Sequence, residues 1–523
     1  MSIDLQVASE RIVSINPATG ERLGEIEIAG EPDVLAAVAR ARQAQAAWQE
    51  SGVRVRLDIL RKFQRLVHQQ KTEIARQITL ESGKPLAEAL TTEVLVVLDA
   101  ARFLIENAYS LLRDEPVRHG NLATKTKSGK IVREPHGVIG IISPWNYPFA
   151  IPATESIAAL VAGNSIVLKP SELTTLSALR LSDLLHAAGV PTDVFQVLPG
   201  FGQTGAALLQ SAIDKLVFTG SVATGKRIAQ EAASRLLPVV LELGGKDPML
   251  VLDDADVDIA SSGAVWGAFV NAGQACLSVE RCYVARKLHD ALLDACVQKT
   301  SQLCVGNGLD PNTDVGPLIN EKQLRTVEAH VEDAISRGAR LLCGGQRLTE
   351  LGPNFYVPTI LADVTHEMRI MKEETFGPVL PIKAFDSDDE AIALANDSEF
   401  GLATSVWTKD RARGERLARR VRAGTVMIND VLSCYGISEA PHGGVRGSGI
   451  GRTHGKYGLE EMVRMKYLDE ERLPGVKRLW WYGYGEEFSH QMQGFVDALF
   501  AGKIRDRVSG ALRAMPSLTR KRL

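Results

Sequence analysis

The sequence predicts an α/β protein built mainly on parallel sheets, and two patterns along the chain support this fold class. From Gly137 onward, short apolar runs alternate with helical stretches, as strands joined by crossover helices do. The first runs are 138–142, 165–168, 194–197, 215–218, 239–241 and 249–252. The alternation resumes at 281–284, 404–407 and 425–428, so we expect a second α/β unit.

Three other segments have a different character. Residues 33–112 carry apolar side chains at three- and four-residue spacing, which predicts amphipathic helices. Residues 121–133 alternate polar and apolar side chains around Ser128 and Gly129, which favours a hairpin serving as an extended arm. The last fifty residues combine Trp and Tyr with a basic tail from Lys503, and we interpret them as an appendage.

Length and charge exclude several classes of function. A chain of 523 residues exceeds what one hydrophobic core usually supports, so two or three domains are expected. The net charge of -3 supplies no basic field for nucleic acid, so the expected partner is a small molecule. Six cysteines without a CxxC pair predict reduced thiols and neither a zinc site nor a disulfide framework. The N-terminal residues lack a signal-peptide pattern and no long apolar run follows, so a cytoplasmic enzyme is expected.

Cys276 is the first candidate for chemistry. It follows Asn271-Ala272-Gly273-Gln274-Ala275, where small side chains leave room for a substrate and for backbone amides facing an oxyanion. A lone cysteine is more often a packing residue, so the rest of the sequence has to decide.

Glu242 and Asn146 are candidate partners for that thiol. Glu242 ends an apolar strand just before Gly244 and Gly245, where loss of water would raise its pKa toward that of a general base. Asn146 lies in a turn between two prolines and presents an amide that can hold an oxyanion. Alone, the first is better explained as a solvated acid at a strand end, and the second fits simple turn chemistry.

Two further segments suit a dinucleotide. Lys169 and Glu172 follow a strand, where both can bind ribose hydroxyls and the carboxylate repels an added 2′-phosphate, which favours NAD over NADP. A surface ion pair explains the same residues. Residues 218–227 open a helix whose first amides suit a pyrophosphate. The same stretch imitates a phosphate-binding GxxxxGK loop, but Arg227 replaces the Ser or Thr that would bind magnesium.

Taken together and in this order, these segments resemble the aldehyde dehydrogenase superfamily from about Asn16 to about Tyr467. Residues 373–378 and 441–449 strengthen the resemblance, which is nearest to succinic-semialdehyde and broad-specificity bacterial enzymes. It implies a Rossmann-type cofactor domain (1–118 and 137–243), an α/β catalytic domain (244–458) and a β-hairpin oligomerisation arm (119–136 and 459–472). Residues 473–523 would be a C-terminal extension.

The resemblance also implies roles for single residues. Cys276 would attack the aldehyde, Asn146 and the Cys276 amide would hold the oxyanion, and Glu242 would activate water against the thioester. The implied cofactor contacts are Trp145, Lys169, Glu172, Gly200, Gly202, Gly220, Ser221, Gly225, Glu374 and Phe376. The implied assembly is a homodimer or homotetramer, with NAD as the preferred cofactor and NADP as the alternative.

The chain departs from the family pattern at two positions, and three questions stay open. Thr453 stands where many relatives carry an acid, and His442 stands where an aromatic residue is more usual. Arg281 and Arg446 fit a substrate carboxylate or ordinary salt bridges, and Cys434 fits the aldehyde pocket or a packed thiol. The C-terminal extension fits a helix packed on a neighbouring subunit, which we favour, or peripheral contact with an anionic membrane.

Two rival functions are considered beside aldehyde oxidation. A CoA-acylating semialdehyde dehydrogenase would share Cys276 and NAD, but relatives of that kind generally lack the glutamate found here at position 242. A non-catalytic binding or structural relative is the alternative from another class, and it would have little reason to keep nucleophile, base and oxyanion donor together.

Overall fold

The structure is a computed structural model that describes residues 11–121, 124–475, 478 and 480–515. The chain divides into two compact units. The larger unit comprises Met1–Arg113 and Arg133–Met465, and the smaller unit comprises Asp114–Val132 and Lys466–Leu523. Both main sheets belong to the larger unit, and each unit is described by itself.

The first main sheet of the larger unit has six strands in the order β17-β9-β8-β5-β6-β7. The five longer strands pair in parallel, and only β17 is antiparallel to its neighbour β9. The strands are β5 (Val138–Ile142), β6 (Ser165–Lys169), β7 (Phe195–Val197), β8 (Lys215–Thr219), β9 (Val239–Glu242) and β17 (Gly449–Ile450). The apolar runs predicted for this region therefore coincide with strands, within one residue at most ends.

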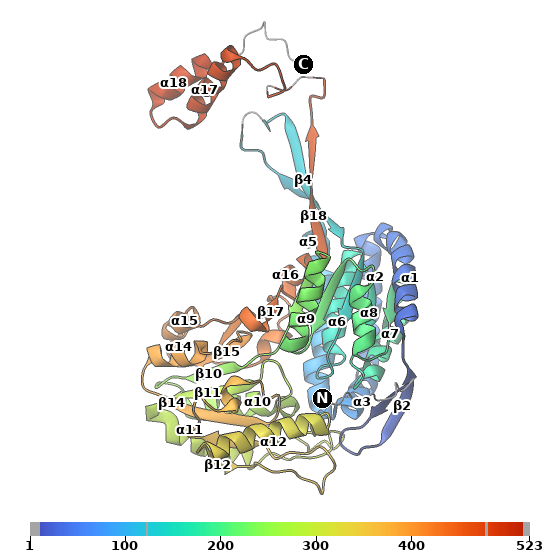
Figure 1. The fold of residues 1–523 in the computed structure, drawn as a ribbon, viewed down its shortest axis with the longest axis vertical. Coiled ribbons are helices and arrows are strands. Elements are labelled where there is room, and N and C mark those ends of the chain that lie inside the picture. Colours follow the sequence, from blue (N-terminus) through green and yellow to red (C-terminus); the bar gives the residue numbers. More distant parts are fainter. Residues whose placement is uncertain (1–10, 122–123, 476–477, 479, 516–523) are drawn as a thin grey trace. The chain divides into compact units, whose positions relative to one another are not determined.

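Helices cover both faces of this sheet. Successive strand residues accordingly belong to different hydrophobic clusters. Ile139 and Ile141 pack with helices α2 (Gly52–Gln69), α5 (Leu95–Leu112), α6 (Ala150–Ala162) and α7 (Thr175–Ala188). Val138 packs with α1 (Glu31–Glu50), α8 (Gly202–Gln210) and α9 (Val222–Ser234). Figure 1 shows helices α6, α8 and α9 in the same part of the larger unit. This two-residue alternation is what a parallel sheet between two helical layers requires.

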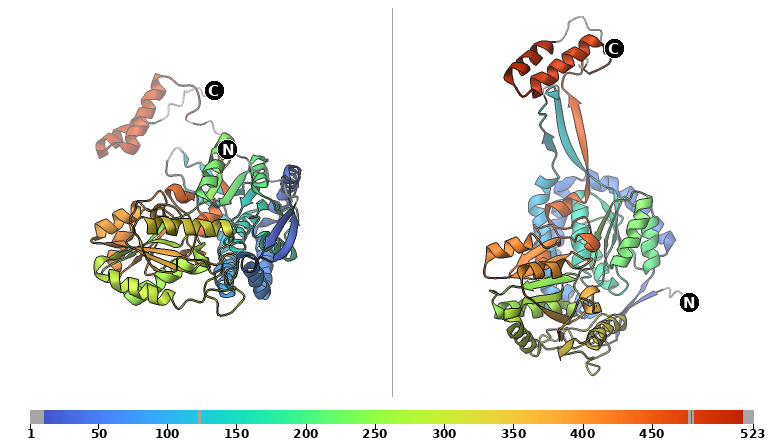
Figure 2. Two further views of the ribbon diagram at one scale, coloured as in Figure 1. Left: turned by 60° about the horizontal axis from the view of Figure 1, so that its bottom comes forward. Right: turned by 60° about the vertical axis from the view of Figure 1, so that its left-hand side comes forward.

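The second main sheet has seven strands in the order β12-β13-β14-β11-β10-β15-β16. All pairs are parallel except β12 with β13. The strands are β10 (Asp247–Val251), β11 (Val279–Ala285), β12 (Arg340–Cys343), β13 (Thr359–Ala362), β14 (Val379–Phe385), β15 (Ala403–Trp407) and β16 (Thr425–Ile428). Helices α10 (Val257–Phe269), α11 (His289–Thr300), α14 (Asp388–Asn396) and α15 (Arg411–Ala418) pack against these strands (Figure 2).

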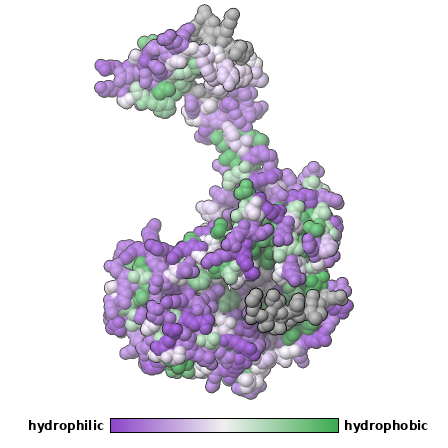
Figure 3. All heavy atoms as spheres, in the orientation of Figure 1, coloured by the Kyte–Doolittle hydropathy of each residue, from purple (hydrophilic) through white to green (hydrophobic). Residues whose placement is uncertain are grey.

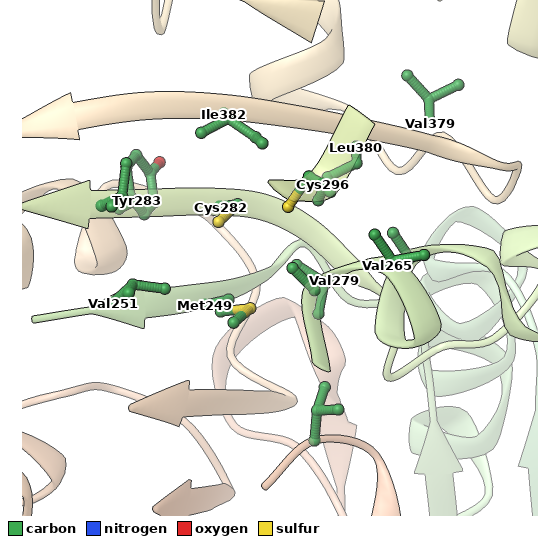
Figure 4. Close-up of a cluster of buried hydrophobic side chains, with 14 of the residues drawn as sticks. Met249, Val251, Val265, Val279, Cys282, Tyr283, Cys296, Val379, Leu380 and Ile382 are labelled. Carbon is green, nitrogen blue, oxygen red and sulfur yellow. The ribbon is translucent and has the colours of Figure 1, made fainter. Parts of the chain in front are cut away.

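Two cysteines belong to the core of this second half. Figure 4 shows Cys282 on β11 and Cys296 on α11 among valine, leucine and isoleucine side chains, and neither is exposed to solvent. These thiols are packing residues. A reactive thiol has to be sought elsewhere.

The remaining elements of the larger unit lie outside its two main sheets. The antiparallel pair β1 (Arg11–Ile15) and β2 (Arg22–Glu27) precedes α1. Helices α3 (Lys71–Ser82) and α4 (Leu86–Glu88) lead into a π-helical turn, Ala89–Val94, ahead of α5. The others are α12 (Glu321–Ser336), α13 (Arg369–Lys372) and α16 (Gly455–Glu460). The predicted helical opening of the chain is confirmed.

The prediction of a hairpin turn at Ser128 and Gly129 is wrong. Both residues lie inside strand β4 (Lys127–Pro135), which pairs antiparallel with β3 (Glu115–Val117) in a sheet of order β18-β4-β3. The third strand is β18 (Val463–Glu471). A Cβ at Gly129 would overlap the ring of Tyr467, so glycine serves a close cross-strand approach there. Residues 122 and 123 of the predicted segment lie outside the described residues.

The C-terminal part of the smaller unit contains two helices. Helices α17 (Glu486–Phe500) and α18 (Ile504–Arg513) pack together, with Gly494 and Gly510 at their close approach. No helix among the described residues is long and apolar enough to cross a membrane. The face of the larger unit seen in Figure 3 is mostly hydrophilic, in keeping with the buried clusters inside it.

Candidate active site

The strands of the six-stranded sheet deliver the predicted cofactor residues to one edge. Trp145 follows β5, Lys169 ends β6, Gly200 follows β7 and Gly220 follows β8. Because these strands are parallel, their carboxyl ends share an edge. The sheet order reverses between β5 and β8, and in open α/β sheets ligands bind in the crevice at such a reversal.

Helix starts and an ion pair give this edge its polar character. Ser221 is the N-cap of α9, and its hydroxyl accepts a hydrogen bond from the Thr224 amide. Lys169 Nζ lies 3.4 Å from a Glu172 carboxylate oxygen, and burial lowers the pKa of the lysine. Gly202 opens α8 with free space where a side chain would project, whereas a Cβ at Gly225 would overlap Leu243. The first glycine keeps the helix start open, and the second allows α9 to pack close.

A loop of the second half reaches the same edge. Glu374 Oε1 accepts a hydrogen bond of 3.1 Å from the Gly245 amide, just beyond the end of β9. Burial raises the pKa of Glu374 to about 8, and the nearby Glu280 carboxylate adds to this. The Phe376 ring meets the Trp145 indole edge-on, with 5.4 Å between centroids. The two halves of the larger unit therefore meet at these residues.

Sequence reasoning missed the pair that holds this loop. Glu280 accepts hydrogen bonds from the amides of Thr375, at 3.1 Å, and Phe376, at 2.9 Å, and it forms a buried ion pair with Lys246. Phe376 has a φ of +53°, which costs energy for a bulky side chain unless its surroundings fix it. An acid and a lysine placed inside apolar stretches were the available signal in the sequence.

Cys276 is presented by a strained turn between α10 and β11. Asn271, Ala272 and Gly273 all have positive φ, at 52°, 54° and 72°. Side-chain hydrogen bonds fix the turn: Asn271 Nδ2 donates to the Gln274 carbonyl at 3.1 Å, and Gln274 Nε2 donates to the Asn271 carbonyl at 2.9 Å. Strain of this kind persists only where the surroundings determine the conformation, and it gathers at functional sites.

Asn146 lies next to this turn. Its side-chain amide donates to the Gln274 carbonyl at 3.2 Å, two residues before Cys276. Its own carbonyl accepts from Lys84 Nζ at 2.8 Å and from Asn271 Nδ2 at 3.1 Å. Lys84 is fully buried and forms an ion pair of 2.6 Å with Glu93. Lys84 and Glu93 were not predicted from the sequence. Lys84, paired with Glu93, anchors the Asn146 backbone through its carbonyl.

Glu242 is buried at the end of β9, with both carboxylate oxygens lacking a hydrogen-bond partner among the described residues. Nε2 of His442 lies 3.9 Å from one of these oxygens. Burial raises its pKa well above the usual range, the charge of Glu155 adds to this, and Arg452 opposes it. The pKa of Cys276 is likewise raised by burial, with contributions from the charges of Asp247, Glu374 and Glu242.

Behind Glu242 lies a buried polar cluster that the sequence indicated only in part. Burial lowers the pKa of His442 to about 3 and that of His454 to about 4, so both imidazoles are neutral near pH 7. Their rings meet that of Tyr435 edge-on, at 4.9 and 4.5 Å between centroids. Burial raises the pKa of Glu155 to about 8. Glu155 is the only charged residue in the apolar helix α6, a signal that was available but unused.

A cavity of about 210 Å³ opens beside Cys276, which is only partly buried. The apolar residues that line it include Val96, Ile151, Trp266, Val270, Leu277 and Leu432. Cys434 is buried and absent from this lining, which favours the packed-thiol reading of that residue. Cys276 is thus the thiol that combines a strained turn, nearby acids and access to a cavity.

The profile of the Aldehyde dehydrogenase family matches residues 5–468, and the chain belongs to this family. It is 38% identical to a 4,4'-diapolycopene aldehyde oxidase of Methylomonas sp, over 94% of this chain and 91% of that protein. It is 39% identical to the NADP(+) succinate-semialdehyde dehydrogenase GabD of Escherichia coli, over 88% and 94%. The NAD+ complex of an aldehyde dehydrogenase from Bacillus cereus matches with a TM-score of 0.85 and 37% identity, covering 88% and 93%.

Family membership and these relatives confirm the predicted fold class and indicate an enzyme that oxidises aldehydes. Relatives that are succinate-semialdehyde dehydrogenases agree with the subgroup that the sequence resembles. Among the described residues, no cluster of His, Cys, Asp and Glu is suited to a metal ion.

Proposed function

We propose that the protein oxidises an aldehyde to a carboxylic acid with NAD(P)+, through a thioester on Cys276 that Glu242 helps to hydrolyse. The observation that carries this is the pairing of a thiol at a cavity with a buried, unpartnered carboxylate whose charge acts on that thiol. A buried carboxylate with a raised pKa is the form expected of a general base for water.

The cofactor-binding edge has the features that a dinucleotide needs. The start of α9 with its Ser221 cap and the open start of α8 at Gly202 supply backbone amides for a pyrophosphate. Lys169 and Glu172 would hold the adenosine ribose, Trp145 would lie beside the adenosine half, and Glu374 would hold the nicotinamide ribose. When bound, the cofactor accepts the hydride that leaves the aldehyde carbon.

The residues of the chain perform the other steps. The Cys276 sulfur bonds to the aldehyde carbon, while Asn146 Nδ2 and the Cys276 amide hold the oxygen that becomes negative. After hydride departure, Glu242 takes a proton from water as that water attacks the thioester carbon. The acid is released, and the carbon–sulfur bond breaks to return the thiolate.

The preference for NAD is part of the proposal. Glu172 lies where a carboxylate would repel an added 2′-phosphate, although its partial exposure weakens the effect. Relatives of both kinds exist, since one binds NAD+ and another is named for NADP(+). We also propose that the protein works as a homo-oligomer, which sedimentation analysis would test.

The direct test replaces Cys276 with alanine. We expect Cys276→Ala to bind NAD+ with unchanged affinity and to form no NADH from any aldehyde, because the nucleophile is gone. Cys296→Ser, in the apolar core and away from the cavity, is the matched control and should keep turnover if it folds. Normal turnover by Cys276→Ala would reject the proposal.

The CoA-acylating alternative predicts another product. Addition of CoA to wild-type enzyme, NAD+ and aldehyde should leave the free acid as the product, because Glu242, with its raised pKa, would activate water. Accumulation of an acyl-CoA would favour the rival. A non-catalytic relative would form no NADH with any aldehyde.

A further inference from the structure

The wall of the cavity beside Cys276 carries no Lys, Arg, His, Asp or Glu side chain within the part of the chain that the structure describes. Its residues come from the π-helical turn before α5, from α5, from Tyr147 and α6, from α10 and the segment 270–277 after it, and from the loop at 432–436. Trp266 is 47% exposed, which places it toward the outer end of the cavity. Any charge on a substrate would therefore lose water without gaining a partner.

Four polar side chains of this wall are already engaged, which leaves the hydroxyl of Tyr147. Thr91 and Thr92 donate their hydroxyls to backbone carbonyls one turn earlier in the same helical segment, at 2.9 and 2.7 Å. The Ser433 hydroxyl is bound to the Asp430 carboxylate. Tyr435 shares a hydrogen bond with Thr154. Few polar groups remain to receive a charged substrate.

The titratable groups that act on the Cys276 thiol offer no cation to an anionic substrate. The charged groups that act on the Cys276 thiol are acidic, Asp247, Glu374 and Glu242 among them, and each raises its pKa. The ammonium of Lys84 lies 3.9 Å from the centre of the Tyr147 ring, but this lysine is fully buried and paired with Glu93. A substrate carboxylate at the cavity would therefore find no cationic partner.

The two arginines with an open role in the sequence are used elsewhere. The guanidinium of Arg281 donates to the backbone carbonyls of Lys246, Leu394 and Ala395 at 2.8 to 3.1 Å. Arg446 donates to the Asn396 carbonyl at 3.3 Å. Neither lines the cavity. Their backbone contacts favour structural roles for both.

We infer that the substrate of Cys276 is an uncharged aldehyde with an apolar aliphatic or aromatic body, and that semialdehydes bearing a carboxylate are poor substrates. This inference rests on the proposed function and names its substrate class. It separates the chain from those of its relatives that are named for succinate semialdehyde. The reason for this preference is the free-energy cost of burying a carboxylate without a partner in the cavity.

The first test compares substrates that differ by one charge. With wild-type enzyme and NAD+, we expect kcat/KM for 4-methylbenzaldehyde to exceed that for 4-carboxybenzaldehyde by at least about 100-fold. Hexanal against succinic semialdehyde provides an aliphatic pair with the same expected order. Equal values, or a preference for the carboxylate in either pair, would overturn the inference.

The second test adds the missing cation. Trp266→Arg places a guanidinium at the outer end of the cavity, where it can stay partly hydrated. We expect the preference for the uncharged aldehyde to fall by at least about tenfold, because the arginine pairs with the substrate carboxylate. Ile259→Arg, exposed on the same helix and outside the cavity, should leave the preference unchanged.

The outcomes separate this inference from the proposed function. If no aldehyde yields NADH, the proposed function fails. If Cys276-dependent oxidation occurs but favours carboxylate-bearing aldehydes, the function stands and the inference fails. If both arginine variants change the preference equally, a general charge effect replaces the cavity as the cause.

Discussion

At the scale of single residues, burial opposes the ionisation of three acids of the site. Glu242, Glu374 and Glu155 all have raised pKa values, with burial as the largest cause in each. Glu155 and Glu242 also repel one another, so the second of the two ionises with greater difficulty. The fraction of Glu242 that can act as a base at a given pH therefore depends on Glu155.

This coupling predicts a shift in the pH dependence of turnover. A base with a raised pKa gains its active form as pH rises, so kcat should climb with pH where thioester hydrolysis limits the rate. Glu155→Gln removes one negative charge, so the rising limb should move to lower pH. The measurement is kcat against pH at saturating aldehyde and NAD+.

Glu415→Gln is the control, because this carboxylate is exposed on α15. It should leave the profile in place. A rising limb that Glu155→Gln does not move, or moves to higher pH, would contradict the coupling.

The proposed preference for NAD gives a second prediction at the scale of one side chain. Glu172→Gln keeps the shape of the ribose contact and removes the repulsion of a 2′-phosphate. We expect the ratio of kcat/KM for NAD+ over NADP+ to fall by about tenfold, a modest change for a partly exposed group. Glu231→Gln, exposed on α9, should not alter the ratio. No change in Glu172→Gln would remove this residue from cofactor selection.

At the scale of elements, the parallel strands and the turn before β11 position the site. Strand ends bring Trp145, Lys169, Gly220 and Glu242 to one edge, and this could be predicted because apolar runs and parallel order are visible in the sequence. The turn that presents Cys276 could not be predicted as strained. Its positive φ angles depend on hydrogen bonds and on contacts from residues distant in the chain.

The buried supports of the site were beyond sequence reasoning for a similar reason. Glu280, Lys84 and Glu93 act through partners that the fold brings together, and their spacing in the chain reveals none of these contacts. Ser128-Gly129 was misjudged because a glycine needed for close packing on Tyr467 looks the same in sequence as a glycine in a turn.

The Cys276 turn gives a prediction about stability. Gly273 has a φ of +72°, and a Cβ there would overlap the backbone of Gly377. Gly273→Ala should lower the free energy of unfolding by about 3 kcal/mol and abolish turnover, because backbone strain and overlap add. The measurement is urea denaturation with a parallel assay.

Gly338→Ala separates the two causes. This glycine has a φ of +98° and free space where a Cβ would stand, so only the backbone cost of about 1–2 kcal/mol should appear, with activity retained. Equal losses in the two variants would show that the contact with Gly377 does not matter.

At the scale of the whole molecule, the proposed catalytic residues come from both halves of the larger unit. The first sheet supplies Glu242 and the cofactor edge, and the segment after α10 supplies Cys276. Contacts of Glu374 with Gly245 and of Phe376 with Trp145 join the two halves. The proposed reaction requires the thiol and the carboxylate to serve the same acyl group from these two sides.

The most direct test follows the acyl group itself. Glu242→Gln mixed with NAD+ and hexanal should release one NADH per active site in a burst and then stall, and intact-mass analysis should show a hexanoyl adduct that peptide mapping places on Cys276. Full steady-state turnover by this variant, or an adduct on another residue, would contradict the division of roles between the thiol and the carboxylate.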